Sequence, residues 1–221
     1  MDETTRQSKE RALWDKQAGG YDQRTLRIYE EAYEQSIART RAALEPGDRV
    51  LEIGCGTGII ALGVAPEVAR VIGTDISSDM IAVAQRKARE QDVDNVTFRV
   101  ADGYDLPFDD ASFDAVLIFN TLHVVKEPET LLKEARRLLK PGRPLITATD
   151  CYAEPVPLRI RLMLVAQTLL DWLGVIAFMR NYTRSELRQL MIRNGFTVEE
   201  MAVLHPAPVN AFILARKRIA D

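Results

Sequence analysis

Histidine and cysteine are scarce in this chain of 221 residues, which has two of each. Cys55 and Cys151 are too few for a disulfide framework. Neither they nor His123 and His205 follow the spacing of a zinc site. The sequence therefore predicts neither a disulfide-stapled domain nor a metal centre.

Basic residues are not in excess: 29 lysines and arginines stand against 32 aspartates and glutamates, for a formal net charge of −3. Proteins that bind nucleic acid through its phosphates carry a basic footprint. Because the chain as a whole lacks one, we expect no nucleic-acid partner.

Uninterrupted apolar runs are also missing. The most apolar stretch, residues 158–179, contains Arg159, Arg161 and Asp171, so it holds no run of the length that a membrane span needs. Residues 1–16 are polar and lack the apolar core of a secretory signal. The pattern predicts a cytoplasmic protein without a transmembrane span.

The most informative stretch that is present runs from residue 50 to 58. An apolar strand passes directly into Gly54, Gly56 and Gly58, and a helical pattern follows. Glycines at these positions let a ligand lie against backbone N–H groups. The spacing G-x-G-x-G differs from the dinucleotide pattern G-x-G-x-x-G, and Glu52 precedes it. A carboxylate there repels phosphates and either accepts from a cationic amine or orders the loop.

Two more acids follow predicted strands. Asp75 ends the strand at 71–75, close to the spacing at which a strand-end carboxylate binds ribose hydroxyls. Its alternative role is a helix N-cap, for which Ser77 is better placed. Asp102 follows the strand at 96–100. Since ligands of open parallel sheets bind outside the carboxyl ends of the strands, we expect these acids and Glu52 to meet in one crevice.

Polar and aromatic candidates lie elsewhere along the chain. The most apolar strand, residues 113–119, ends in Asn120 and then His123, which is either a catalytic base or a locally satisfied loop residue. Tyr21 follows two glycines and either folds over a ligand or packs locally. Tyr182 and His205 are weaker candidates for contact with a substrate.

Alternating strands and helices predict one α/β domain. We expect a Rossmann-like, doubly wound, seven-stranded and mainly parallel sheet with an antiparallel edge strand. Its segments are an N-terminal helical cap (1–45), a cofactor-binding core (46–150), a helical insertion or acceptor lid (151–183), and a terminal helix and strand hairpin (184–221).

Finer expectations concern three places. The helix over 26–44 turns Ile28 toward the core, and the prolines at 206–208 indicate a broad hairpin. Residues 155–180 are either a packing helix or dimer face, or an apolar roof over a lipophilic acceptor that also permits peripheral membrane contact. The protein is accordingly a monomer or a homodimer.

In their order, these motifs resemble the class I S-adenosylmethionine-dependent methyltransferases. The resemblance rests on residues 50–58, Asp75, residues 101–103, 113–123 and 138–142. Within this family, the sequence is most similar to the small-molecule branch that includes the quinone-biosynthesis C-methyltransferases. The resemblance implies S-adenosyl-L-methionine as cofactor, S-adenosyl-L-homocysteine as product, and a small, lipophilic or aromatic acceptor.

The resemblance also implies a set of cofactor contacts. Glu52 would lie near the methionyl amine, Asp75 would hold the ribose hydroxyls, and Asp102 would accept from the adenine amine. The full set of implied cofactor-binding residues is Tyr21, Glu52, Gly54, Cys55, Gly56, Gly58, Asp75, Ile76, Met80, Asp102, Gly103 and Asn120.

Two other classes of function stay open from the residues. One is a nicotinamide-dependent oxidoreductase, against which the glycine spacing and Glu52 both count. The other is a non-catalytic protein that binds the cofactor and recruits a partner through residues 155–180.

Overall fold

The computed structural model describes residues 3–154 and 178–219. Residues 155–177, which hold most of the predicted insertion, lie outside the described residues. So do the terminal residues 1–2 and 220–221.

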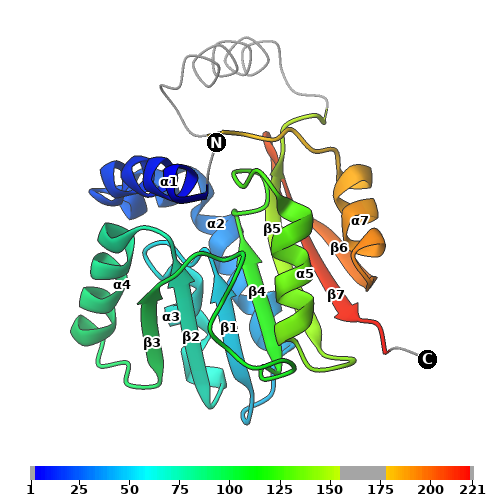
Figure 1. Ribbon diagram of the computed structural model, residues 1–221, viewed down its shortest axis with the longest axis horizontal. Helices are drawn as coiled ribbons and strands as arrows, with labels where there is room; N and C mark the ends of the chain where they lie inside the picture. Colours follow the sequence, from blue (N-terminus) through cyan, green and yellow to red (C-terminus); the bar gives the residue numbers. More distant parts are fainter. Residues whose placement is uncertain (1–2, 155–177, 220–221) are drawn as a thin grey trace.

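One seven-stranded sheet forms the centre of the molecule, with strand order β3-β2-β1-β4-β5-β7-β6 (Figure 1). Neighbouring strands from β3 to β5 are parallel, whereas β7 runs antiparallel to both β5 and the edge strand β6. The predicted seven-stranded, mainly parallel sheet is thus confirmed. The strands are β1 (Arg49–Ile53), β2 (Arg70–Asp75), β3 (Val96–Val100), β4 (Ala115–Phe119), β5 (Pro144–Cys151), β6 (Phe196–Pro206) and β7 (Val209–Lys217).

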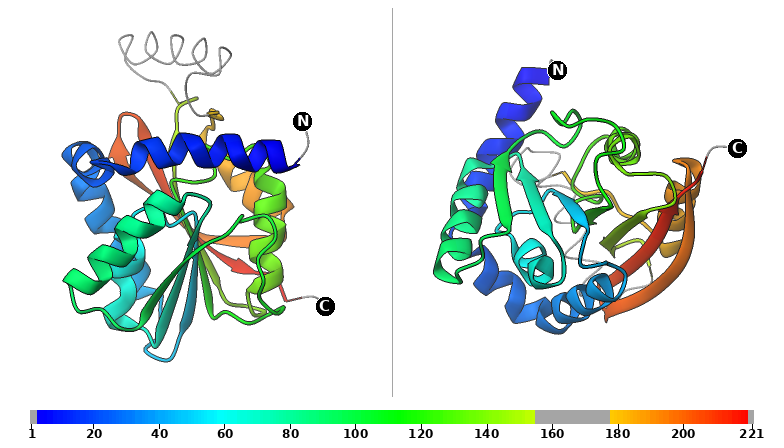
Figure 2. Two further views of the ribbon diagram at one scale, coloured as in Figure 1. Left: turned by 60° about the vertical axis from the view of Figure 1, so that its left-hand side comes forward. Right: turned by 90° about the horizontal axis from the view of Figure 1, so that it is seen from below.

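Helices cover both faces of the sheet, as Figure 2 shows from two further sides. Apolar residues of α2, α3 and α4 pack on one face, and those of α5 and α7 pack on the other. Every residue of β4 is buried, as expected for a central strand covered on both faces. The helices are α1 (Glu3–Ala18), α2 (Tyr21–Ala42), α3 (Ile59–Val64), the 3₁₀ turn η1 (Ala65–Glu67), α4 (Ser78–Glu90), α5 (Pro128–Leu138) and α7 (Arg184–Arg193).

Two helix starts have side-chain caps, and the one at Ser77 was predicted. The Ser77 hydroxyl accepts a hydrogen bond from the backbone N–H of Met80 at 3.1 Å and begins α4. Thr183 and Glu186 form a reciprocal capping box that begins α7. Ser77 therefore fills the capping role that was the alternative for Asp75.

Two finer expectations are wrong. Ile28 is 60% exposed, because α2 packs through Ala32 and Tyr33 and has non-helical dihedral angles at Tyr29. The β6–β7 hairpin is tight rather than broad, since only residues 207 and 208 separate the two strands. Proline ends β6 at Pro206 but does not lengthen the connection.

The sheet topology determines where a ligand site can form. Strand order reverses between β1 and β4, and in open α/β sheets the crevice lies at such a point, outside the carboxyl ends of the strands. α1 lies across this end of the sheet (Figure 2). Among the described helices, none has both the length and the apolar character needed to cross a membrane.

Candidate functional site

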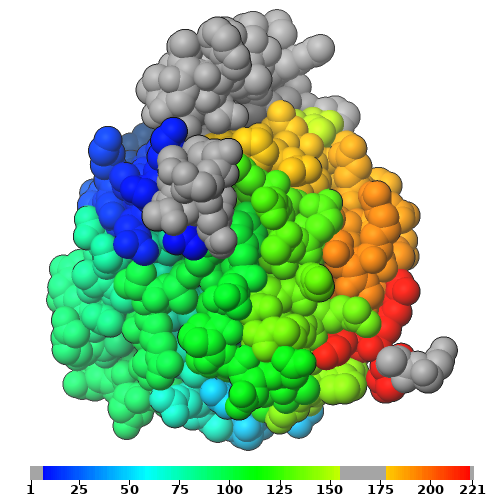
Figure 3. Space-filling view, in the orientation of Figure 1, coloured from blue at the N-terminus to red at the C-terminus, as the bar shows by residue number. Residues whose placement is uncertain are grey.

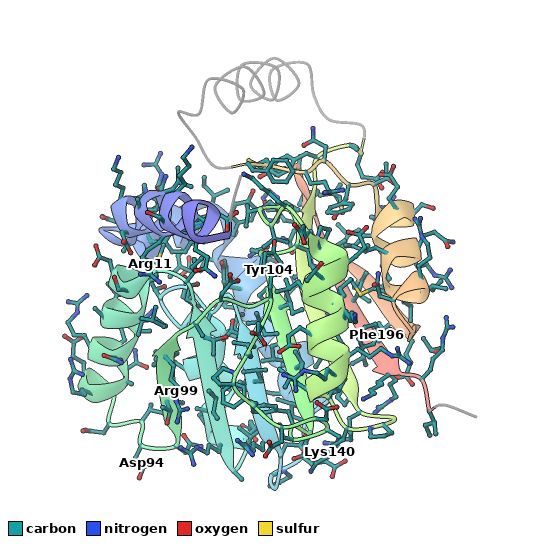
Figure 4. All side chains as sticks on the ribbon, in the orientation of Figure 1. Arg11, Asp94, Arg99, Tyr104, Lys140 and Phe196 are labelled. Carbon is teal, nitrogen blue, oxygen red and sulfur yellow. The ribbon has the colours of Figure 1, made fainter. Side chains whose placement is uncertain are left out.

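A pocket opens at the carboxyl ends of β1, β2, β3 and β4. All of the predicted cofactor-binding residues except Gly58 line it: Tyr21, Glu52, Gly54, Cys55, Gly56, Asp75, Ile76, Met80, Asp102, Gly103 and Asn120. Tyr104, another lining residue, lies at the same end of the sheet as Arg11 of α1, whereas Asp94 and Lys140 mark the opposite end (Figure 4). The predicted convergence of the three acids on one crevice is therefore confirmed.

The glycine loop after β1 has the left-handed backbone that its sequence predicts. Gly54, Gly56 and Gly58 have φ values of 70°, 51° and 77°. A Cβ at Gly54 would overlap the Thr121 side chain, whereas a Cβ at Gly56 would meet no atom within 4 Å. Gly58 is buried, and a Cβ there would strike Phe98. Gly56 therefore faces the open pocket, and Gly58 serves the packing beneath it.

Asp75 connects two parts of the pocket wall. Its Oδ2 accepts a hydrogen bond from the Gly56 N–H at 2.8 Å, and its Oδ1 accepts one from the Ser77 N–H at 2.9 Å. Burial raises the pKa of this carboxyl, and the two backbone hydrogen bonds oppose that rise. A carboxylate has further lone pairs, so these bonds leave room for ligand hydroxyls.

Glu52 is the most unusual acid of the site. It is only 2% exposed, and its Oε2 has no hydrogen-bond partner among the described residues. Burial raises the pKa of the carboxyl well above its ordinary range. Buried polar atoms are normally hydrogen-bonded, so a buried acceptor without a partner at the wall of a pocket indicates a place for a ligand donor.

Helix α1 covers the Asp102 side of the pocket. Gln7 Nε2 donates to Asp102 Oδ2 at 3.0 Å, and Arg11 Nε donates to the backbone oxygen of Ile76 at 3.1 Å. Glu10 and Trp14 line the pocket from this helix. In the space-filling view, α1 (blue) lies directly against neighbouring blue-green and green segments (Figure 3). The helix thus forms one wall of the site.

A comparison with protein families identifies the domain that contains this pocket. Residues 51–147, which run from β1 into β5, match the family model described as a methyltransferase domain. This domain belongs to the class I S-adenosylmethionine-dependent methyltransferases. The match includes the glycine loop and all three strand-end acids of the pocket.

Individual relatives agree with the domain assignment. Demethylmenaquinone methyltransferase of Clavibacter sepedonicus is 39% identical over 150 residues, which are 66% of this chain and 60% of that relative. The chain therefore spans less than two thirds of the length of the curated relatives that it matches first.

Solved structures share the fold of the methyltransferase domain. The protein bound to the Trm112 methyltransferase activator of Haloferax volcanii superposes with a TM-score of 0.78 and 21% identity, covering 96% of this chain and 98% of that one. Geranyl diphosphate C-methyltransferase of Streptomyces coelicolor, solved with Mg²⁺, geranyl diphosphate and S-adenosyl-L-homocysteine, has a TM-score of 0.67 and 19% identity, covering 83% and 78%.

At the β4 end of the methyltransferase domain, Asn120 adopts a left-handed backbone with φ 50°. Its Nδ2 donates to the Tyr33 hydroxyl at 3.2 Å, and its Oδ1 accepts from Asn210 Nδ2 at 3.0 Å. Tyr33 lines the pocket beside Asn120, and sequence reasoning missed it. Its contact with Asn120 joins residues that are far apart in the chain, which no local pattern reveals.

The other missed residues come from several elements. Trp14 could have been found from the sequence, because it is the one aromatic side chain in the mainly polar helix α1. No sequence signal marked the apolar wall of the pocket, since the pattern of its residues is equally typical of ordinary core or loop positions. That wall consists of Phe119, Val124, Val125 and Leu131.

The three weaker candidates do not line the pocket, and Tyr182 and His205 also lie outside the matched residues 51–147. His123 is 7% exposed, its Nδ1 has no hydrogen-bond partner within the described ranges, and burial lowers its pKa. Tyr182 is 6% exposed, and His205 packs against the Tyr29 ring with centroids 4.9 Å apart. Roles in catalysis or substrate binding for these three stay predictions.

Proposed function

We propose that this protein transfers the methyl group of S-adenosyl-L-methionine to a small, uncharged, lipophilic or aromatic acceptor. The observation that carries the proposal is the buried Glu52 Oε2, which has no hydrogen-bond partner among the described residues and belongs to a residue that lines the same pocket as the open backbone of Gly56. A cationic amine beside a backbone-lined cradle fits this arrangement better than a phosphate does.

The residues present fit the cofactor along its length. Glu52 would hold the methionyl amine, Asp75 the ribose hydroxyls and Asp102 the adenine amine, at the ends of β1, β2 and β3. Ile76 and Met80 supply apolar surface for the adenine ring, and Gly54 and Gly56 allow close backbone approach. Cys55, Gly103, Asn120 and Tyr21 complete the assigned set.

The chemistry demands little from the protein beyond position. When bound, S-adenosylmethionine supplies a methyl group that its sulfonium already activates. The chain's own residues then have to orient the acceptor and exclude water. Phe119, Val124 and Val125 form an apolar wall suited to both tasks. A general base is needed only where the acceptor must lose a proton.

The charge of the pocket selects among acceptors. Its described lining includes Glu10, Glu52, Asp75 and Asp102 but neither lysine nor arginine. A phosphorylated or carboxylated acceptor would meet these acids without a compensating cation. We therefore assign an uncharged acceptor, in contrast to the geranyl diphosphate bound by one structural neighbour.

Calorimetric titration tests the donor half of the proposal. We expect S-adenosylmethionine and S-adenosylhomocysteine to bind and NADH not to bind. Binding of NADH without S-adenosylmethionine would instead favour the oxidoreductase, and would remove the basis of the proposal.

A radiolabelled methyl-transfer screen tests the acceptor half. We expect label in a hydroxylated aromatic probe such as 1,4-naphthoquinol, the class suggested by the demethylmenaquinone methyltransferase relatives, and none in geranyl diphosphate. Tight cofactor binding with no transfer to any quinol, phenol, thiol or amine would favour the non-catalytic binding protein.

A further inference from the structure

The glycine loop is anchored to β2 through its first half. The N–H groups of Gly54 and Cys55 both donate to the backbone oxygen of Thr74, at 2.8 Å and 2.9 Å. The Gly56 N–H donates to Asp75 Oδ2 at 2.8 Å. These bonds to β2 end at Gly56, and a glycine-rich backbone is costly to order without further support. A side chain supports the second half of the loop instead.

Thr57 provides that support. It lies between the left-handed Gly56 and Gly58, is 2% exposed and lines the pocket. Its Oγ1 donates a hydrogen bond to Asp22 Oδ1. Asp22 lies in the first turn of α2, directly after the pocket-lining Tyr21. This one bond therefore joins the glycine loop to the N-terminal wall of the pocket, 35 residues away in the chain.

Asp22 is itself fixed from a third element. Lys87, in the last turn of α4, donates from its Nζ to Asp22 Oδ2 at 2.6 Å. The Lys87 and Asp22 side chains are only 17% and 30% exposed, so water and salt screen this ion pair less than they screen a surface pair. A hydrogen bond to an ionised acceptor is about twice as strong as a neutral one. The bond from Thr57 to Asp22 is therefore suited to holding the loop.

We propose that Asp22 is a positioning residue that holds the glycine loop in its ligand-binding shape through the Thr57 hydroxyl. The inference rests on the proposed function, because it takes the loop as the backbone cradle of the ligand. Asp22 does not line the pocket, so it acts through Thr57 and not by contact with the ligand. Without the bond, the ligand has to order the loop as it binds, and that cost appears as weaker affinity.

Three substitutions test the bond from its two ends. Thr57→Val removes the hydroxyl and keeps the shape of the side chain, whereas Thr57→Ser keeps the hydroxyl. Asp22→Ala removes the acceptor. A bond that served folding alone would change the melting temperature of these proteins and would leave the ligand affinity of the folded proteins unchanged.

The chain offers two matched controls. Thr40→Val alters a fully buried threonine of α2 whose hydroxyl has no hydrogen-bond partner among the described residues. Asp114→Ala removes an aspartate that also pairs with a lysine at 2.6 Å, but at the opposite end of the sheet, where Lys140 lies (Figure 4). Neither Thr40 nor Asp114 lines the pocket. Both control proteins should bind the ligand as tightly as the wild type.

Calorimetry with S-adenosylhomocysteine gives the measurement. We expect Thr57→Val and Asp22→Ala each to weaken binding about tenfold, and Thr57→Ser to bind like the wild type. A double variant with both Thr57→Val and Asp22→Ala should bind no more weakly than either single variant, because the two substitutions remove the same bond. Thermal denaturation verifies that each protein is folded.

Three results would overturn the inference. One is wild-type affinity in folded Thr57→Val and Asp22→Ala. Another is a double variant in which the two losses multiply, because the two residues would then act independently. The third is an equal loss in Thr57→Ser and Thr57→Val, since the shape of the side chain rather than the hydroxyl would then matter. Should Asp22→Ala not fold, the comparison of Thr57→Ser with Thr57→Val carries the test. A wild-type protein that binds neither S-adenosylhomocysteine nor S-adenosylmethionine would refute the proposed function, and this inference with it.

Discussion

The Asp75 carboxylate ties the end of β2 to the glycine loop after β1, since its Oδ2 accepts a hydrogen bond from the Gly56 N–H at 2.8 Å. Its other oxygen holds the Ser77 N–H at the start of α4. One half-buried side chain therefore orders the loop and also lines the pocket. A ligand that binds Asp75 in the pocket would therefore also affect the order of the loop.

Replacing Asp75 should affect both properties. In Asp75→Ala, the Gly56 and Ser77 amides lose their acceptor, at a cost of about 1–3 kcal/mol for each group that stays buried and unpaired. We expect S-adenosylmethionine affinity to fall more than tenfold and the melting temperature to drop. Calorimetry and thermal denaturation measure the two effects, with the exposed Asp109→Ala as control. Unchanged affinity would refute the ribose assignment.

Glu52 should make stability and binding respond to pH in opposite ways. Burial raises its pKa in the folded protein, so its contribution to stability is complete below the unfolded-state pKa and is lost as pH rises through the folded-state pKa. Relative to the wild type, ligand-free Glu52→Gln should gain stability as pH rises from acid to neutral. Denaturation curves across this range measure the difference, and a difference independent of pH would contradict the raised pKa.

The same carboxyl should link ligand affinity to proton release. A cationic amine favours the ionised form, so wild-type affinity for S-adenosylmethionine should rise with pH up to the ligand-free pKa of Glu52. In Glu52→Gln, affinity should be weaker and the part of the pH dependence that Glu52 causes should disappear. Titrations in buffers of different ionisation enthalpy report the proton release directly. Equal proton release in both proteins would show that another group is responsible.

Two neighbouring glycines should respond differently to alanine. Gly54→Ala and Gly56→Ala share the cost of a left-handed backbone, about 1–2 kcal/mol. Only Gly54→Ala also drives a methyl group into Thr121. We expect Gly54→Ala to be clearly less stable than Gly56→Ala, whereas Gly56→Ala should lose ligand affinity because its methyl group enters the pocket. Equal melting temperatures would contradict the packing at Gly54.

Trp14 should report ligand binding through its fluorescence. It lines the pocket from α1, and the chain has only one other tryptophan, Trp172. In a Trp172→Phe background, S-adenosylhomocysteine should change the emission of Trp14 with the same dissociation constant that calorimetry gives. The Trp14→Phe protein serves as the control. In this protein, S-adenosylhomocysteine should cause no change of emission with that dissociation constant. A silent Trp14 at saturating ligand would argue against α1 as a wall of the occupied site.

The sequence predicted those parts of the site that are formed by short runs of consecutive residues. The glycine loop and the acids that follow β1, β2 and β3 occupy local patterns, and parallel strands bring their ends together automatically. The caps at Ser77 and Thr183 are equally local. Hence most of the pocket residues that follow these strands were predicted from the sequence.

The missed parts depend on long-range contacts. Tyr33 meets Asn120, and Asn120 meets Asn210, across helices and strands whose packing no single segment specifies. Ile28 was misplaced because helical periodicity alone cannot locate the change of direction at Tyr29. Tertiary packing, rather than local propensity, decided each of these positions.

Asn120, directly after the central strand β4, has a left-handed backbone, and its side chain makes two hydrogen bonds. Glycine would relax that backbone and would abolish both side-chain hydrogen bonds. Asparagine tolerates a left-handed backbone, and each buried partner left unpaired costs about 1–3 kcal/mol, so Asn120→Gly should lose stability together with the amide that connects β7 to the pocket. At residue 120, stability and the structure of the pocket wall therefore favour the same side chain, and a library built for thermal stability should leave it unchanged.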